Sequence, residues 1–322
     1  MSRYKAFLLC CILSLFSLNV VCQLELLKDI YPGPTSGTVA PGGAIYNSKF
    51  YFGANDKVHS TEIHVSEGTN QTTKLFVNLA NNAPFNLGGN PDFFYASSNK
   101  LYFRSSDSYY RQAPYVTDGT VEGTIRLMEN GMSWFSHTEI DGIVYFTLNI
   151  HDGAGKGKHG FELWRSDGTR NGTYMVKDII PGPTSSFPVN FINYNDTIYF
   201  NTRESTGSNL WITDGTESGT LLKHDFNPND SLGNYYIESI LVHNDKLLIH
   251  AQTAEYGGEW WTYDSSSGNY SLLKDINRGV GPGTVNNVTF NGDLYLFGRD
   301  VNNHHIMWRT DGTTQNTVEV YN

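Results

Sequence analysis

Hydrophobic residues in this chain come in short runs that are separated by polar turn residues. Six runs rich in aromatic and aliphatic residues recur along the chain, at residues 49–54, 100–105, 143–148, 197–202, 246–251 and 293–298. Gly, Asn or Asp stands just before most of them, which is typical of a turn that leads into a strand. No segment keeps a helical period. The pattern therefore predicts an all-β protein.

A recurring turn sequence indicates the length of the structural unit. Asp-Gly-Thr begins at four positions, a weaker copy begins at Glu67 and an eroded copy at Asp264; the four are Asp118, Asp167, Asp214 and Asp311. Successive starts are 51, 49, 47, 50 and 47 residues apart. A unit of about 50 residues has room for four short strands with turns between them. Six units of four strands are therefore predicted.

The faces of the predicted strands indicate how the units pack. Leu163 and Trp164 are neighbours in one strand, so they point to opposite faces and both faces are apolar. Sheets covered on both faces are typical of units stacked face against face, and a closed ring achieves this without an exposed end unit. A linear solenoid would need polar caps, which neither end of the sequence resembles. The predicted fold class is therefore a six-bladed β-propeller.

A third recurring strand, which ends in Lys-Asp-Ile or a variant of it, predicts how the ring closes. It occurs at residues 24–30 and, in degenerate form, at 317–321, so it has seven copies against six of the other strands. We expect one terminal copy to complete a blade that begins at the other end, so that the terminal strands close the ring. The alternative is that the seventh copy is the first strand of a missing unit.

The turn residues have a structural interpretation. Asp accepts hydrogen bonds from the backbone amides ahead of it, Gly tolerates a positive φ, and Thr returns the chain to a strand. The aspartates could instead ligate a metal. A calcium loop, however, carries several oxygen ligands at close spacing, and each of these turns carries one carboxylate. We therefore expect a scaffold turn and no metal site.

The repeat resembles that of a known family. Residues 162–169 read ELWRSDGT, residues 210–216 keep LW and DGT, and residues 307–313 keep W and DGT. Other units depart from the pattern; the first has Ile63-His64 in place of Leu-Trp. Over essentially all of residues 23–322 the chain is similar to the ELWxxDGT repeat family. The resemblance implies a secreted or surface propeller, but it implies no reaction.

The first 22 residues have the layout of a secretory signal peptide. Arg3 and Lys5 precede an apolar run, and a polar sequence starts at Gln23. A membrane anchor or a buried strand is the alternative, although the run is short for a spanning helix. The cysteines all lie in this leader: Cys10, Cys11 and Cys22. We therefore predict a signal peptide at 1–22, a single β-propeller domain at 23–322 and no disulfide in the mature chain.

Charge and hydropathy bear on the choice of partner. The chain has 22 Lys and Arg against 32 Asp and Glu, a formal net charge of −10, and no basic run beyond the leader. Nucleic acid and anionic membranes are therefore not expected as partners. No second long apolar segment predicts a membrane span in the mature chain. An extracellular glycan or a matrix protein is the kind of partner that we expect.

Patterns that indicate enzymes fit poorly. Sialidase propellers carry Ser-x-Asp-x-Gly-x-Thr-Trp, whereas residues 166–169 read SDGT without spacers. Residues 151–160 (HDGAGKGKHG) lack the spacing and the following helix of a phosphate-binding loop. His304 and His305 are adjacent, so on a strand they cannot easily share a metal. Carboxylates that converge in space cannot be picked from one sequence, so a hydrolase stays open, with no catalytic residue, metal or cofactor predicted.

Binding is expected where the repeats differ, because loops on a rigid scaffold commonly carry function. Departures concentrate at residues 108–111, 131–137 and 151–159. The candidate ligand-binding residues are Tyr109, Tyr110, Arg111, Trp134 and His151. Loop drift without function would produce the same pattern. Other aromatic residues outside the repeat are Phe135, Tyr235, Tyr236 and Tyr256.

Six glycosylation sequons follow the leader, at Asn70, Asn171, Asn195, Asn229, Asn269 and Asn287. In a eukaryotic source they predict a glycoprotein, although several can arise by chance in a chain rich in Asn and Thr. Together with the leader and the repeat, they predict a secreted, extracellular, non-enzymatic propeller with a binding or structural role in the matrix. The alternative is a secreted hydrolase of glycans or another polar polymer, with its site at the channel mouth.

Overall fold

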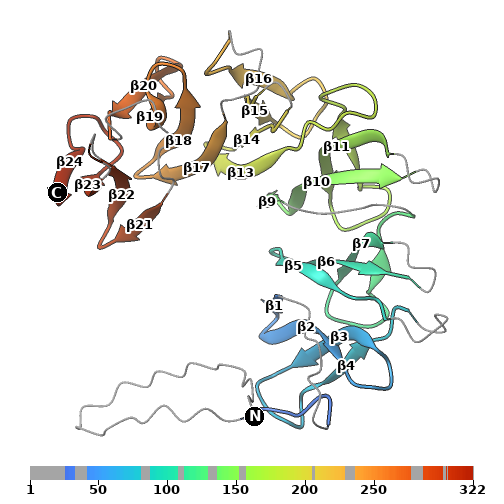
Figure 1. Cartoon of the computed structure of the whole chain (residues 1–322). Helices are drawn as coiled ribbons and strands as arrows, with labels where there is room; N and C mark the ends of the chain where they lie inside the picture. The colour runs from blue at the N-terminus through green and yellow to red at the C-terminus, as the bar shows by residue number, and fades with distance from the viewer. Residues whose placement is uncertain are drawn as a thin grey trace, which may run out of the picture. The chain divides into compact units, whose positions relative to one another are not determined.

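The computed structural model consists of strands and turns, with no helix in the residues that it describes. These are residues 26–32, 42–80, 88–107, 112–129, 136–151, 157–204, 207–228, 236–276, 286–299, 302 and 304–321. Within them, 24 strands form six sheets of four strands each (Figure 1). The all-β class and the four strands per repeat are confirmed, and six such sheets fit a six-bladed propeller.

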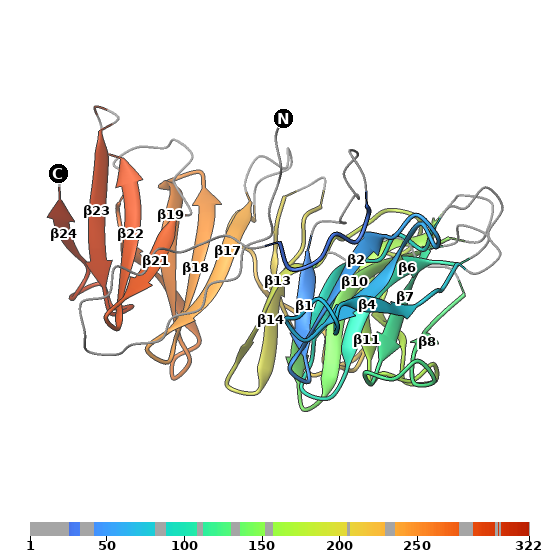
Figure 2. The same ribbon diagram turned by 90° about the horizontal axis from the view of Figure 1, so that it is seen from below.

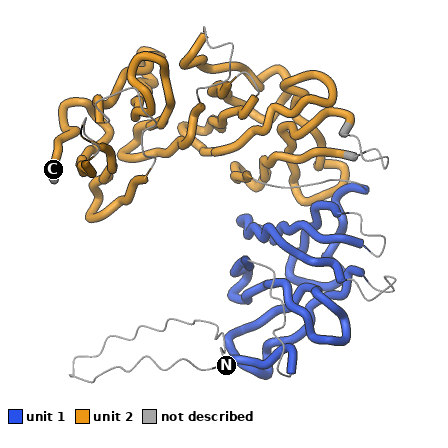
Figure 3. Tube along the Cα trace, viewed as in Figure 1, with its two compact units in different colours: residues 1–129 blue, residues 130–322 orange. Residues whose placement is uncertain are grey.

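The chain divides into two compact units, Met1–Glu129 and Asn130–Asn322 (Figure 3). The first unit holds two sheets. Sheet one consists of β1 (Gly43–Tyr46), β2 (Lys49–Asn55), β3 (Thr61–Ser66) and β4 (Lys74–Val77). Sheet two consists of β5 (Asp92–Ala96), β6 (Leu101–Ser106), β7 (Gln112–Thr117) and β8 (Ile125–Arg126). A single domain over residues 23–322 stays a prediction.

The second unit holds four sheets, whose strands pair in chain order, as Figure 2 shows for sheet six. Sheet three consists of β9 (His137–Ile140), β10 (Ile143–His151), β11 (Gly157–Ser166) and β12 (Tyr174–Lys177). Sheet four consists of β13 (Val189–Tyr194), β14 (Thr197–Asn201), β15 (Leu210–Thr213) and β16 (Leu221–His224). Sheet five consists of β17 (Ile237–His243), β18 (Lys246–Thr253), β19 (Gly257–Asp264) and β20 (Asn269–Lys274). Sheet six consists of β21 (Asn287–Phe290), β22 (Asp293–Arg299), β23 (His305–Thr310) and β24 (Val318–Tyr321).

Each sheet has two ends that differ in character. Because the paired strands are antiparallel, the turns after the first and third strands lie at one end, which we call the turn end. The hairpin between the second and third strands and the connection to the next sheet lie at the other end, which we call the connection end. The Asp-Gly-Thr turns join third and fourth strands and therefore lie at the turn ends.

The Asp-Gly-Thr turn is held by its own side chains. In sheet three, Asp167 accepts bonds from the Thr169 backbone N–H at 2.8 Å and from the Thr169 hydroxyl at 2.7 Å. Gly168 has a φ of 83°. The same contacts recur around Asp118, Asp214 and Asp311. The predicted scaffold turn is thus confirmed.

Two further features of the turn lie beyond the predicted motif. A Cβ atom on Gly172 would lie 2.1 Å from the Asp167 carboxylate, so only glycine fits there. The hydroxyl groups of Ser166 and Thr173 are 2.7 Å apart, and the Ser166 hydroxyl also accepts the Gly168 N–H at 3.0 Å. The longer motif therefore ties the start of the fourth strand to the end of the third.

Hydrophobic clusters join successive sheets within each unit. In the first unit, Tyr51 and Ile63 of sheet one belong to a cluster with Phe103 and Tyr115 of sheet two. In the second unit, comparable clusters join sheets three and four, four and five, and five and six. Sheets four and five are therefore covered on both faces, as the apolar residues on both sides of their strands indicate.

The expected pairing of the terminal strands is not among the pairings of the described residues. Residues 26–32 form no strand, and sheet six consists of β21 to β24 alone. The C-terminal copy of the Lys-Asp-Ile strand is β24, which completes sheet six as its fourth strand, so this sheet already has its four strands without a copy from the other end of the chain. Lys28 of the N-terminal copy donates instead to the Thr73 carbonyl of sheet one.

Candidate functional site

The glutamate of the repeat is buried and holds the connection that leaves its sheet. Glu62, Glu162 and Glu259 are fully buried in sheets one, three and five. The Glu162 carboxylate accepts the backbone N–H groups of Ile179 and Ser186, both at 2.9 Å. It also accepts the Ser186 hydroxyl at 2.6 Å. Glu162 therefore fixes the path from sheet three to sheet four.

Glu62 holds the connection that leaves sheet one through backbone donors. It accepts the N–H groups of Leu79 and Ala80 at 3.1 Å each and that of Gly89 at 2.8 Å. Burial raises the pKa of Glu62 in spite of these bonds, and burial raises the pKa of Glu162 to about 7. These carboxylates, like the turn aspartates, are therefore committed to contacts within the scaffold.

The candidate ligand-binding residues fall largely outside the described part of the chain. Tyr109, Tyr110, Arg111 and Trp134 lie outside it, and His151 is described only by its backbone at the end of β10. In the sequence, residues 108–111 fall between β6 and β7, residues 131–136 between β8 and β9, and residues 152–156 between β10 and β11.

Other residues singled out from the sequence are placed by the structure. Tyr236 is 39 % exposed, and Tyr256 is half-buried with its ring 6.0 Å from that of Trp261. Phe135 and Tyr235 lie outside the described residues. Five sequon asparagines are exposed, namely Asn70, Asn171, Asn195, Asn269 and Asn287, and Asn229 lies outside the described residues.

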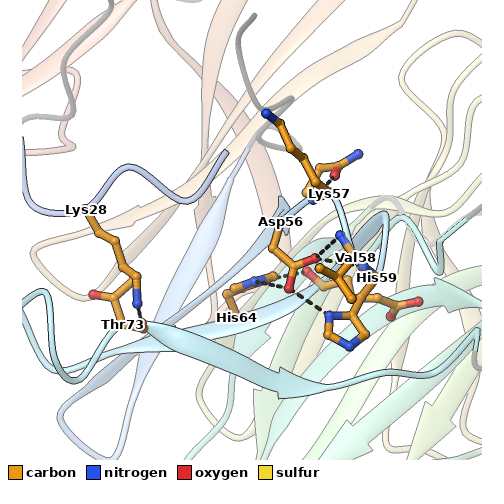
Figure 4. Close-up of polar contacts among 9 residues, drawn as sticks. Lys28, Asp56, Lys57, Val58, His59, His64 and Thr73 are labelled. Carbon is orange, nitrogen blue, oxygen red and sulfur yellow. Dashed lines mark hydrogen bonds and ion pairs between the residues drawn. The ribbon is translucent and has the colours of Figure 1, made fainter. Parts of the chain in front are cut away.

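A polar cluster lies at the connection end of sheet one, formed by Asp56, His59 and His64 (Figure 4). Asp56 Oδ1 accepts the backbone N–H groups of Val58 at 2.9 Å and His59 at 2.7 Å. Asp56 Oδ2 lies 2.7 Å from His59 Nδ1 and 3.9 Å from His64 Nε2. The hairpin backbone therefore holds one carboxylate between two imidazole rings.

The contacts of this cluster indicate where its protons reside. His64 Nδ1 lies 3.1 Å from the Glu62 carbonyl oxygen, so in the neutral ring this nitrogen carries the proton. His59 donates from Nδ1 to Asp56, which leaves Nε2 as its acceptor nitrogen. Burial would raise the pKa of Asp56, but the bonds from His59 and Val58 outweigh it and keep that pKa below its usual value. Burial lowers the pKa of His64.

The arrangement offers an oriented imidazole beside an ionised carboxylate. The His59 side chain is 33 % exposed, so ligands can reach it. An imidazole held in this way can accept a hydroxyl proton, either in binding or as a general base.

The connection ends of other sheets carry different polar pairs. In sheet two, Arg104 Nε donates to Asp92 at 2.7 Å. Between β11 and the segment after β12, His159 Nδ1 lies 2.6 Å from Asp178 Oδ2. The turn ends, by contrast, repeat the same hydroxyl and carboxylate contacts. Chemical variety among the sheets is therefore concentrated at the connection ends.

Sequence reasoning alone did not assign Asp56, His59 and His64 to a site. One signal was present, because His64 stands where the third to sixth repeats have tryptophan. The contact with Asp56 depends on the shape of the β2–β3 hairpin, which spacing alone does not reveal.

Within the described residues, no group of three or more His, Cys, Asp or Glu side chains could hold a metal ion. The same part of the chain contains no helix with the length and apolar character needed to cross a membrane.

Comparison with known proteins supports the fold. No protein-family model and no curated protein sequence matches the chain. A puromycin-hydrolyzing peptidase of Mycobacterium tuberculosis is similar in structure, with 11% identity, a TM-score of 0.50, and coverage of 86% of this chain and 43% of that one. A puromycin hydrolase has 12% identity, a TM-score of 0.47, and coverage of 89% and 47%. The chain thus spans less than half of either protein, and at such identity the likeness concerns the fold alone.

Proposed function

We propose that this chain is a secreted, extracellular, non-enzymatic β-propeller that binds a glycan or a matrix protein. The observation that carries the proposal is that repeated and variable polar residues have different roles within each sheet. The acidic residues of the repeat are bonded to the scaffold, as Asp167 and Glu162 illustrate. The polar residues that vary from sheet to sheet lie at the connection ends. The repeated residues thus stabilise the scaffold, and the residues that vary between sheets are available to bind a partner.

The exposed sequons support an extracellular location. Asn70, Asn171 and Asn269 lie in turn ends, and all three are exposed, as a glycan attachment site requires. The leader at residues 1–22 and the resemblance to the ELWxxDGT repeat family point in the same direction. Glycans on these three residues would leave the connection ends of their own sheets accessible to a partner, whereas Asn287, at the start of β21, lies at the connection end of sheet six.

We also propose that the propeller ring is closed. Lys28 donates to the Thr73 carbonyl of sheet one just as Lys177, on the fourth strand of sheet three, donates to the Thr220 carbonyl of sheet four at 3.0 Å. Residues 26–30 therefore contact sheet one in the manner of a fourth strand from a preceding sheet. Lys57, in the β2–β3 hairpin of sheet one, donates to the carbonyl of Pro32, which lies just after residues 26–30.

Apolar residues on the first and last sheets further support closure. Ile45 of sheet one is 71 % exposed, and Phe290 of sheet six is 61 % exposed. In sheets four and five, by contrast, both faces are covered by neighbours. A closed ring would cover the outer faces of the terminal sheets in the same way.

A second candidate function is a hydrolase of glycans or another polar polymer. The observation that favours it is the Asp56–His59 pair, whose imidazole is oriented and accessible. Such a pair can act as a general base. The same geometry also suits hydroxyl recognition, which requires no further group.

One experiment separates the two functions. Purified protein comprising residues 23–322 is applied to a glycan array and to immobilised matrix proteins, and the bound glycans are incubated and assayed for new reducing ends. We expect binding without cleavage. Cleavage by the wild-type protein that is lost in His59→Ala, with unchanged melting, would overturn the binding proposal and support the hydrolase. His305→Ala, an exposed histidine on β23, is the matched control.

A further inference from the structure

The connection ends of sheets four and five are joined through their first strands. β13 and β17 lie side by side (Figure 1). The Asn190 side-chain amide donates to the Glu238 backbone carbonyl at 3.1 Å and to the Asn201 side chain at 2.9 Å. Both strands belong to the second unit. Side chains from two sheets therefore form one local surface.

Glu238 is presented on this surface by an irregularity in its strand. The register of β17 and β18 shifts between Ile237 and Ser239, on either side of Glu238. The Glu238 side chain is 36 % exposed, so its carboxylate can be reached from solvent. A bulge of this kind commonly redirects a side chain. Glu238 is thus held in place by the backbone and remains accessible.

A buried histidine lies behind this carboxylate. His250 on β18 is fully buried, and its Nδ1 lies 3.5 Å from Glu238 Oε2. Glu238 is the polar group that His250 Nδ1 faces, and the distance is at the long limit of a hydrogen bond. The His250 ring meets that of Trp260 edge-on at 5.2 Å. The contact with Glu238 therefore gives this buried imidazole a polar neighbour.

The charge of Glu238 is favoured by its neighbours. The pKa of Glu238 is lowered, chiefly by His250 and to a smaller degree by the positive charge of Arg203. Arg203 is exposed, and its backbone N–H donates to the Ser186 carbonyl at 2.8 Å. The surface therefore combines an ionised acceptor with a cationic donor.

An exposed aromatic residue, Tyr236, stands two positions before Glu238 in the chain. Tyr236 directly precedes β17, and its carbonyl accepts the Gln252 N–H at 2.9 Å, which fixes its backbone. Its side chain contributes to the 39 % exposure of this residue. A carboxylate that accepts hydroxyl protons, a guanidinium that donates and a ring that covers a C–H face match the groups of a pyranose.

We propose that the connection end of sheets four and five binds a neutral oligosaccharide through Glu238, Arg203 and Tyr236. His250 is a positioning residue, which holds the Glu238 carboxylate toward the ligand. The carboxylate disfavours anionic polymers, which is why the ligand is neutral. This inference rests on the proposed function, of which it names the ligand class and the site.

Sheet two provides an internal contrast. There the carboxylate and guanidinium occupy the corresponding edge but bond to each other, with Arg104 donating to both oxygens of Asp92. Arg104 also lies 4.5 Å above the Phe93 ring. The donor, the acceptor and the ring of sheet two therefore satisfy one another. At the connection end of sheets four and five, by contrast, the carboxylate of Glu238 belongs to β17 of sheet five, and the guanidinium of Arg203 follows β14 of sheet four.

The test uses titration calorimetry of residues 23–322 with maltohexaose, cellohexaose, chitohexaose, mannohexaose and xylohexaose. We expect at least one to bind, and Glu238→Gln and Tyr236→Ala each to weaken it about tenfold or more. Glu255→Gln removes an exposed charge from the β18–β19 turn of the same sheet and is expected to leave affinity unchanged.

The role of His250 has a separate readout. His250→Gln is expected to weaken binding and to move the acid limb of the affinity–pH profile upward, because Glu238 loses the neighbour that favours its charged form. A merely structural histidine would change melting without moving that limb. Glu238→Gln removes the titrating carboxylate and is expected to abolish the limb.

The failure of this inference differs from the failure of the proposed function. Binding that survives both Glu238→Gln and Tyr236→Ala, or binding of matrix protein with none of the five oligosaccharides, overturns the site while the binding function stands. Cleavage of an oligosaccharide by the wild-type protein overturns the non-enzymatic function.

Discussion

Glu62 and Glu162 occupy the same place in sheets one and three, but they meet different donors. Glu62 accepts three backbone N–H groups. Glu162 accepts two, and its third donor is the Ser186 hydroxyl. A hydroxyl can rotate and accept a hydrogen bond, whereas an N–H can only donate. Burial raises the pKa of both glutamates, and in sheet three one of the three donors is a group that can also accept a hydrogen bond from a protonated carboxyl.

The difference teaches that a shared motif does not imply shared chemistry. Both glutamates are fully buried and both secure a connection. Their response to pH depends on residues that lie outside the repeat motif. The pKa of Glu162 is raised to about 7, which places its titration near neutrality.

The largest expected effect is on the pH dependence of stability. The pKa of Glu162 is higher in the folded chain than in the unfolded one, so the folded state binds its proton more tightly. Its stabilising contribution is therefore complete below about pH 4.5 and is lost as pH rises through about 7, a change of about 2–3 kcal/mol. Denaturant unfolding at a series of pH values measures it. Glu162→Gln should flatten the curve in this window; an unchanged slope would contradict the assignment.

The next effect compares the stability lost on substitution of the buried glutamates Glu62 and Glu162. Glu62→Gln brings an amide NH₂ against backbone N–H groups, and we expect a loss of about 2 kcal/mol in the free energy of unfolding. In Glu162→Gln the NH₂ also faces a backbone N–H in either orientation. At the Oε2 position it can in addition donate to the Ser186 hydroxyl, so we expect a smaller loss, of about 1 kcal/mol. Both variants are compared at pH 7 by chemical denaturation. Equal losses, or a larger loss at Glu162, would show that the donors do not govern the difference.

A smaller effect tests the hydroxyl itself. Ser186→Ala removes the donor that distinguishes Glu162 from Glu62, and we expect a loss of about 1 kcal/mol. The stability loss assigned to Glu162 should move to higher pH in the same variant, because the charged carboxylate loses the hydroxyl that donates to it and lowers its pKa. Thr184→Ala, in the same connection, is the control. If Ser186→Ala kept the wild-type pH dependence of stability, the Ser186 hydroxyl would not influence the titration of Glu162.

The smallest effect concerns the lysines that join neighbouring strands. Lys177→Ala removes the bond to the Thr220 carbonyl and should cost about 0.5 kcal/mol. Lys28→Ala should cost about the same if residues 26–30 act as a fourth strand against sheet one. Thermal melting of both variants provides the comparison. If Lys28→Ala left the melting temperature unchanged while Lys177→Ala lowered it, the result would contradict the proposed ring closure.

Repetition made the fold accessible to sequence reasoning. The period of Asp-Gly-Thr and the recurring apolar runs predict six groups of four strands, because turn chemistry and alternation are local. The contacts of Asp167 with Thr169 are equally local and were also predictable. The burial of Glu162 was not predicted, although one spacing repeats, because Leu79, Ile179 and Ile276 each donate to a glutamate 17 residues earlier in the chain. The other donors, such as Ser186 and Gly89, do not share a spacing.

The candidate sites were harder to predict for a related reason. Asp56 and His59 meet because of one hairpin, and Glu238 meets His250 through a shift in strand register. Neither contact corresponds to a spacing that repeats along the sequence. The sequence pointed to loops where the repeats differ, and most of the residues selected there lie outside the described part of the chain.

The pairing of strands only with neighbours in the chain has a consequence for folding. All four strands of sheet one lie within Gly43–Val77, and those of sheet three lie within His137–Lys177. Pairings of such short range close small loops, so their entropic cost is low and their formation is fast. Each sheet can therefore nucleate as soon as its own segment has emerged from the ribosome. We expect the order of folding to follow the order of synthesis, with the stacking of sheets as the slower step.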